Sequence, residues 1–231
     1  MSVIFPKWMN ALPTLGALGA VGGAVVVALG GWYWATPDFF EAGYSPVQPG
    51  SGFNHQIHVG KLGMDCRYCH TNVEESPEAN IPPVSTCNSC HGENRVSPAI
   101  STASDAKVLF IREAFDDDKS IEWRRVHKLP DYVRNFPHDV HVTAGVSCFS
   151  CHGQVMAMPQ VYQKEGLGMG WCLDCHRHPE KALVPPERVT DLLWVEGELE
   201  ARAKGEGTTN AEALRSQLWD SPPETCGACH Q

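Results

Sequence analysis

The chain has 231 residues, of which 42% are hydrophobic, and its formal net charge is −9. This acidic balance, with Lys and Arg scattered along the chain, excludes the basic surface that a nucleic-acid-binding protein needs. Long apolar runs are scarce beyond the N-terminal region, and 17 Pro and 21 Gly interrupt the sequence, so an ordinary hydrophobic core would be poor.

The first predicted element is an uncharged, almost wholly apolar stretch at 11–31. Its 21 residues suit the ~20 that a helix needs to cross the hydrocarbon core of a membrane. Trp8 precedes it and three aromatic residues follow at 32–34, as at two membrane interfaces. A cleaved signal peptide is the alternative, but its apolar region would be shorter and would end at small residues. Gly19 and Gly23 have the spacing of a helix-packing face.

Charges on the two sides of this stretch predict its orientation. Lys7 lies before it, whereas Asp38 and Glu41 lie beyond it, which favours a cytoplasmic N-terminus. We therefore expect a single-pass protein of the inner (cytoplasmic) membrane with its remaining domain in the periplasm.

Five Cys-x-x-Cys-His runs account for all ten cysteines. Two cysteines three apart lie on one face of a helical turn, where both thiols reach the vinyl groups of one porphyrin, and the next histidine can bind the iron. The spacing between pairs also suits four-cysteine zinc sites, but zinc needs no histidine after every pair, and the fifth pair would lack a partner. We predict five c-type haems, attached to Cys66, Cys69, Cys87, Cys90, Cys148, Cys151, Cys172, Cys175, Cys226 and Cys229, with iron ligands His70, His91, His152, His176 and His230.

The first four runs belong to an internal repeat. A Phe-x-His-x-x-His segment precedes two Cys-x-x-Cys-His runs in each unit, and these runs begin 21 residues apart in the first unit and 24 in the second. The paired histidines resemble those of class III multihaem cytochromes, in which each of the two serves a different haem. We expect them to be distal iron ligands, namely His55 and His58 in the first unit and His138 and His141 in the second.

Two histidines remain for the fifth distal position. His127 is the preferred ligand, and His178, two residues past a motif histidine, is left unassigned. Met169 is the leading methionine alternative, followed by Met156 and Met158, although methionine also fills gaps against apolar surfaces.

The expected fold is mainly α and irregular, with a multihaem domain packed around its haems and one N-terminal transmembrane helix. Helices are predicted at 105–115, 186–204 and 210–219, with Asn210 as an N-cap, and no sheet of any size is expected. The predicted organisation is an anchor at 1–35, a linker at 36–52, a two-haem module at 53–95, an insertion at 96–135, a second two-haem module at 136–178, and C-terminal helices with the fifth haem at 179–231.

Two further runs carry a family resemblance. Residues 121–133 read Ile-Glu-Trp-Arg-Arg-Val-His-Lys-Leu-Pro-Asp-Tyr-Val, and Cys-His-Gly-Gln-Val-Met-Ala-Met-Pro at 151–159 leads on to Met-Gly-Trp-Cys at 169–172. With one span and five motifs, the chain resembles the pentahaem subunit of alternative complex III. This resemblance implies electron transfer from membrane quinol, with integral-membrane and iron–sulfur subunits as partners and a monohaem cytochrome c or a terminal oxidase as acceptor.

Two other functions remain open from the sequence. A multihaem reductase, such as a nitrite reductase, needs one iron with an open position, whereas this chain has more candidate ligands than irons. A single-span tetrahaem quinol dehydrogenase would account less well for five motifs in a repeated pattern.

Overall fold

The structure is a computed structural model that describes residues 6–35, 42–95, 105–129, 133, 136–218 and 221–230. Predictions that fall on 36–41, 96–104, 130–132, 134–135 and 219 lie outside these ranges; they include the acidic residues beyond the span. Within the described ranges the regular structure is helical, with one isolated bridge between Val146 and Leu183 and no strand. The predicted mainly α and irregular fold is confirmed.

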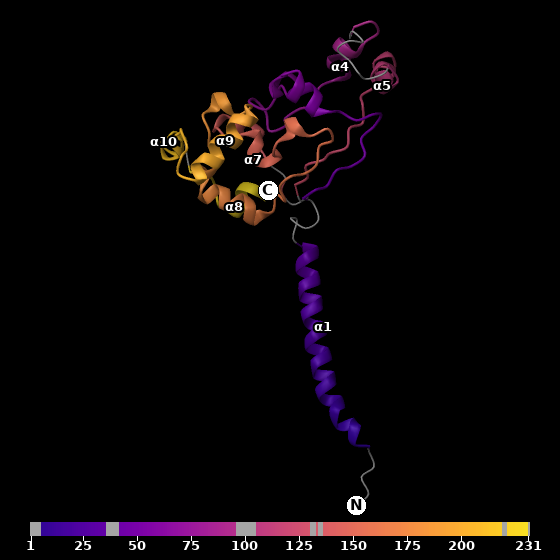
Figure 1. Cartoon of the computed structure of the whole chain (residues 1–231), viewed down its shortest axis with the longest axis vertical. Coiled ribbons are helices and arrows are strands. Elements are labelled where there is room, and N and C mark those ends of the chain that lie inside the picture. The colour runs from indigo at the N-terminus through magenta and orange to yellow at the C-terminus, as the bar shows by residue number, and fades with distance from the viewer. Residues whose placement is uncertain are drawn as a thin grey trace, which may run out of the picture.

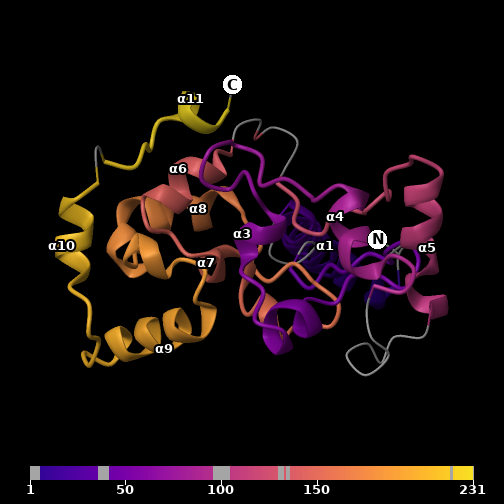
Figure 2. The ribbon, with the colours of Figure 1, turned by 90° about the horizontal axis from the view of Figure 1, so that it is seen from above.

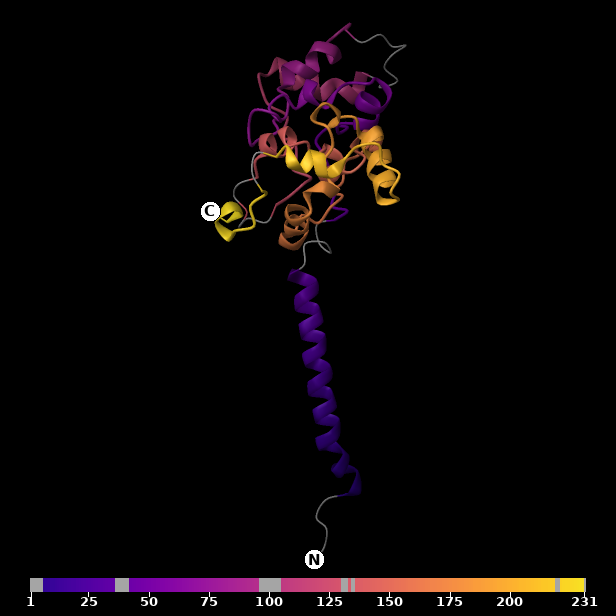
Figure 3. The ribbon, with the colours of Figure 1, turned by 90° about the vertical axis from the view of Figure 1, so that its left-hand side faces the viewer.

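The N-terminal helix stands apart from the rest of the molecule as a straight rod (Figures 1 and 3). A short turn, η1 (Lys7–Ala11), leads into α1 (Leu12–Ala35), so the helix continues beyond the apolar stretch predicted at 11–31. By length and composition Lys7–Tyr33 can cross a membrane, and none of it is buried against the protein. The predicted N-terminal apolar helix is therefore present, and it is long enough to cross a membrane.

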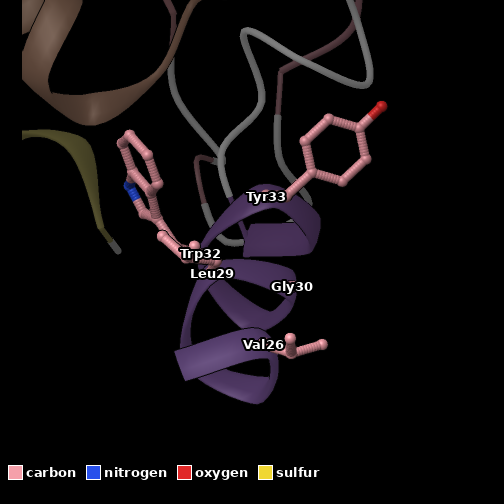
Figure 4. A pocket seen from close by; sticks show the side chains of 5 residues that line it. All are labelled: Val26, Leu29, Gly30, Trp32 and Tyr33. Atoms are coloured by element: carbon pink, nitrogen blue, oxygen red, sulfur yellow. The ribbon is translucent and has the colours of Figure 1, made fainter. Parts of the chain in front are cut away.

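Aromatic residues mark the end of α1 nearest to the main domain. Trp32 and Tyr33, with Val26, Leu29 and Gly30, line a shallow apolar hollow there (Figure 4). Both rings are largely exposed. An apolar ring with a polar edge is favoured at the level of lipid head groups, so this position fits the predicted aromatic belt.

Short helices joined by irregular chain form the main domain, and the two units of the repeat lie side by side (Figure 2). The first unit contains the π-helical turn η2 (Gln56–Lys61), α3 (Cys66–Cys69) and α4 (Val84–His91), with α5 (Asp105–Asp116) beside α4. The second contains α6 (His138–Thr143), α7 (Cys148–His152), η3 (Val155–Ala157) and α8 (Met169–Arg177). The C-terminal part contains η4 (Pro179–Lys181), η5 (Pro186–Arg188), α9 (Leu192–Ala203), α10 (Ala211–Ser216) and α11 (Cys226–Cys229).

The predicted helix at 105–115 is confirmed as α5, and the single helix predicted at 186–204 is wrong. The chain forms η5, breaks, and begins α9 only after Asp191, whose side chain accepts a hydrogen bond from the Trp194 amide. This carboxylate satisfies an amide that a continuous helix would bond internally. Asn210 caps α10 as predicted, although that helix ends at Ser216.

Buried aliphatic side chains from both units and from the C-terminal part form one small cluster. It consists of Val73, Val142, Val184, Val189 and Val195. Beside it, the buried hydroxyl of Ser147 donates to the carbonyl of Val189 at 2.6 Å. So small a cluster agrees with the sparse apolar content of the sequence.

Candidate haem sites

Each of the five motif cysteine pairs lies on one helical turn. Three of the turns are very short helices, α3, α7 and α11, while the other two pairs lie within α4 and α8. Side chains start two of the helices: Asp65 accepts from the Arg67 amide at 2.8 Å, and Ser147 accepts from the Phe149 amide at 3.2 Å. None of the ten cysteines forms a disulfide bond. Paired thiols therefore lie on a common face, as attachment to one macrocycle requires.

Backbone carbonyls fix the orientation of five imidazole rings. In each ring Nδ1 lies 2.6–2.8 Å from a carbonyl oxygen. Since a carbonyl can only accept, Nδ1 carries the proton and the lone pair remains on Nε2, the arrangement usual for metal-binding histidines. The pairs are His58 with Asn54, His70 with Asn80, His138 with Pro77, His141 with Pro137 and His176 with Pro223.

Two motif histidines each face a histidine of the predicted distal set. The ring centroids of His58 and His91 are 5.8 Å apart, and those of His141 and His176 are 6.2 Å apart. One metal ion bound between two imidazoles separates their centroids by roughly 6 Å, given metal–nitrogen bonds of about 2 Å. The spacing in both units therefore fits a single iron with two axial histidines.

A phenylalanine supports both histidines of each His-x-x-His pair. Phe53 stacks on His58 at 4.4 Å and meets His55 edge-on at 4.7 Å. In the second unit Phe136 stacks on its second histidine at 4.5 Å and meets His138 edge-on at 5.0 Å. Sequence analysis assigned no role to these rings, although their repetition two residues before each pair is the signal that marks them.

Further histidines gather where the two units meet. His127 and His152 are in contact, with centroids 4.1 Å apart, so an iron between them requires the rings to separate by about 2 Å. Burial lowers the pKa of His127 to about 4 and that of His152 to about 3. The pKa of His55 is also lowered to about 4, mainly by burial and next by the nearby His70. Neutral imidazole is the form that binds metal.

Two ring nitrogens in this group are buried without a hydrogen-bond partner, Nε2 of His127 and Nδ1 of His55. An unpartnered buried polar atom is costly unless another group completes it. A haem iron bound to Nε2 of His127 would supply the partner that this nitrogen lacks. The donor set and these orphaned atoms fit the predicted haem at this junction.

The first motifs of the two units are adjacent in space. The thiols of Cys66 and Cys148 are close enough to perturb each other, and this interaction lowers the pKa of the first and, with burial, raises that of the second. Close by, the Thr190 hydroxyl donates to Asp65 at 2.9 Å. The chain thus holds two attachment sites side by side.

The segment just before the C-terminal motif contacts the end of the fourth motif. Arg177 at the end of α8 forms an ion pair of 3.0 Å with Glu224, next to the Pro223 carbonyl that receives His176. Among the described residues no three His, Cys, Asp or Glu side chains converge as a single-ion cluster. The structure therefore adds no support to the four-cysteine zinc alternative.

The remaining candidate ligands are more exposed. Met169 is 61% exposed at the start of α8, and the side chain of His178 is 50% exposed, with Nδ1 3.5 Å from Glu180. Met158 is buried, and its carbonyl accepts from the Gln56 amide at 3.2 Å. Burial and an orphaned Nε2 favour His127 over Met169.

Comparison with known proteins finds a similarity over most of the chain. The chain is 26% identical over 219 residues to the multiheme cytochrome c subunit of menaquinone reductase from Nitratidesulfovibrio vulgaris, and the matched region covers 90% of this chain and 87% of the relative. No protein-family model matches the chain. The similarity extends over both repeated units and agrees with the predicted class of multihaem c-type cytochromes.

Proposed function

We propose that this chain is a multihaem c-type cytochrome, the electron-transfer subunit of a quinone-linked respiratory complex in a membrane. One observation carries the proposal: five Cys-x-x-Cys-His turns occur in a helical chain that sets further histidines opposite the motif histidines at metal-bridging distance. The name of the relative, a menaquinone reductase subunit, supports the link to quinone.

The ten motif cysteines would hold five haems, and the five motif histidines would be the proximal iron ligands. Among the distal ligands we assign His58 to the iron of His91 and His141 to the iron of His176, from the facing rings. His127 is assigned to the iron of His152, which it contacts. His55 and His138 complete the distal set.

The bound haems would supply one-electron oxidation and reduction, and the protein sets the conditions for it. Nδ1–carbonyl hydrogen bonds hold the imidazoles in one orientation and raise their basicity toward the metal. The Cys66–Cys148 contact keeps two attachment sites close together, as relay between neighbouring centres requires. Burial of the His152 ring lowers its pKa and so keeps the imidazole neutral at the junction.

The partners follow from the anchor and from the resemblance to the pentahaem subunit of alternative complex III. Helix α1 would hold the domain on the periplasmic face, with the N-terminus in the cytoplasm. Gly19 and Gly23 would face another membrane helix, because their four-residue spacing permits close helix packing. Iron–sulfur and integral-membrane subunits would deliver electrons from quinol, and a cytochrome c or terminal oxidase would accept them.

The test uses the native complex purified in detergent. Addition of a menaquinol analogue should reduce the haems of this chain, seen as the sharp α-band of reduced low-spin c-type haem, while nitrite and hydroxylamine should not reoxidise them catalytically. Reduction by quinol of the isolated chain alone would favour a self-sufficient quinol dehydrogenase. Turnover of nitrite would favour a reductase with an open iron.

A further inference from the structure

Gln163 is the most deeply buried polar side chain outside the haem sites, with 0% exposure. Its Oε1 accepts a hydrogen bond from the backbone amide of Lys128 at 3.0 Å, and its Nε2 donates to the carbonyl of Glu165 at 3.0 Å. Lys128 directly follows His127, so the hydrogen bond to the Lys128 amide fixes the peptide group that joins it to the histidine.

The same residue joins this segment to the linker that follows the membrane helix. The backbone amide of Gln163 donates to the Tyr44 carbonyl at 2.8 Å, and its carbonyl accepts from the Gly43 amide at 2.7 Å. The ammonium group of Lys128 lies 3.9 Å from the centroid of the Tyr44 ring. Three segments far apart in sequence therefore meet at one buried side chain.

The chain segment that leads to His127 needs these hydrogen bonds because it forms no regular secondary structure. Residues 119–126 make no helix or strand, yet His127 is packed against His152. A second glutamine braces the segment further upstream: Gln48 donates to the Arg124 carbonyl at 2.9 Å and accepts from the Arg124 amide at 3.0 Å. Of the two braces, only the one from Gln163 is adjacent to the histidine.

We propose that Gln163 is a positioning residue for His127, holding its ring over His152 so that Nε2 remains available to the iron of the third motif. This inference rests on the proposed haem function. An amide side chain suits the role because Oε1 accepts from Lys128 while Nε2 is satisfied by Glu165, so neither polar atom is left unpaired in a buried place.

The linker contacts give the positioning a second consequence. Because residues 43 and 44 bond to the backbone of Gln163, the peptide of His127 keeps a fixed place relative to the chain that leaves the membrane helix.

The experiment compares Q163L, Q163E and Q48L in the full-length chain, with H127A as the positive control. Haem per chain is measured first, because five haems in every variant shows that the proposed function stands. The binding rate of carbon monoxide to the reduced protein and the high-spin ferric signal in electron paramagnetic resonance then report whether one iron has lost its distal ligand. The temperature of unfolding is measured beside them.

H127A should create one haem per chain that binds carbon monoxide. Q163L should raise the binding rate roughly tenfold, as expected for a lost hydrogen bond that leaves a buried amide unpaired. Q163E keeps an acceptor for Lys128 and, as the neutral acid that burial favours, also a donor for Glu165, so it should remain within about twofold of the original protein. Q48L should do the same because it releases only Arg124.

Two results would overturn the inference while the proposed function survives. One is Q163L with five haems and an unchanged rate, and the other is an equal rise in Q48L and Q163L, which would indicate general loosening of the segment. If Q163L does not accumulate with haem, Q163N decides by the same criteria, because its shorter side chain cannot reach Lys128 but remains polar.

Discussion

Nδ1 of His176 lies 2.6 Å from the carbonyl oxygen of Pro223, which is 47 residues further along the chain. This contact fastens the C-terminal tail to the fourth motif, and it makes the basicity of one motif histidine depend on a distant segment. The fourth and fifth motifs are thus coupled through the backbone as well as by proximity.

We predict that removal of residues 220–231 raises the reduction potential of the fourth haem relative to a C226A/C229A variant. Both proteins lose the fifth haem, but only the truncated chain loses the Pro223 carbonyl, which makes His176 a stronger donor to oxidised iron. The difference should be on the order of 60 mV, one tenfold change in relative affinity for a one-electron couple. A redox titration with equal potentials in the two variants would contradict this role of the carbonyl.

The Arg177–Glu224 ion pair should matter far less. Its side chains are 56% and 49% exposed, so solvent screens their attraction. E224A should change the free energy of unfolding by less than about 1 kcal/mol and leave the haem spectrum unchanged. Denaturant titration checks the first statement, and a shift of the fourth potential in E224A would show that the side chains, rather than the carbonyl, make the contact.

The facing rings predict different behaviour for His141 and His178. H141A should produce one high-spin haem that binds carbon monoxide, because His141 faces His176 at 6.2 Å. H178A is the matched control, since His178 is half exposed and contacts Glu180. Covalent haem content should stay at five in both proteins. Equal behaviour of the two variants in carbon monoxide binding would refute the assignment of His141.

Gly60 lies where η2 and η3 approach each other. A Cβ added there would be 2.5 Å from the backbone carbonyl oxygen of Met156, too close for either backbone to tolerate without moving. G60A should lower the free energy of unfolding by about 1–3 kcal/mol. In contrast, G197A in the middle of α9 meets no atom within 4 Å and should raise it by roughly 0.5–1 kcal/mol. Chemical denaturation of both variants measures these changes, and equal stability of G60A and the original chain would contradict the close approach.

Glu198 makes stability depend on acid pH. It is 5% exposed, and burial alone would raise its pKa, but hydrogen bonds from the amides and hydroxyls of Thr208 and Thr209 outweigh burial and lower the pKa to about 2. The unfolded chain therefore binds this proton more readily than the folded one does. Its contribution to stability is complete above about pH 4.5 and is lost as the pH falls toward 2.

Unfolding followed between pH 5 and pH 2 tests this contribution. E198Q should lose part of the acid-dependent fall in stability, whereas E200Q, on an exposed position of the same helix, should not. An identical acid profile for E198Q and the original chain would show that the threonine contacts do not hold the carboxylate.

The motif spacing was enough to predict the helical turns, because these depend on residues close in sequence. The repeat also marked His58 as a candidate distal ligand, but it did not indicate that this ring would lie opposite His91, which is 33 residues further along the chain. The N-terminal apolar helix could also be predicted from the sequence, because its length and composition are sufficient to indicate it.

Contacts between distant segments were beyond reach of the sequence. Nothing local indicates that the Pro223 carbonyl receives His176, or that Gln163 supports the peptide of Lys128. The break before α9 was missed because residues 186–191 have helical character, while the competing Asp191 cap depends on the turn that precedes it. Tertiary pairing decided each of these features.

The central claim is that five haems are covalently attached, and mass measurement of the intact chain purified from its membrane tests it most directly. The account predicts a single species heavier than the polypeptide by five haems, which falls to three in a C66A/C69A/C148A/C151A variant. A chain of unmodified mass, or one that carries fewer than five haems or bound zinc instead, would contradict it.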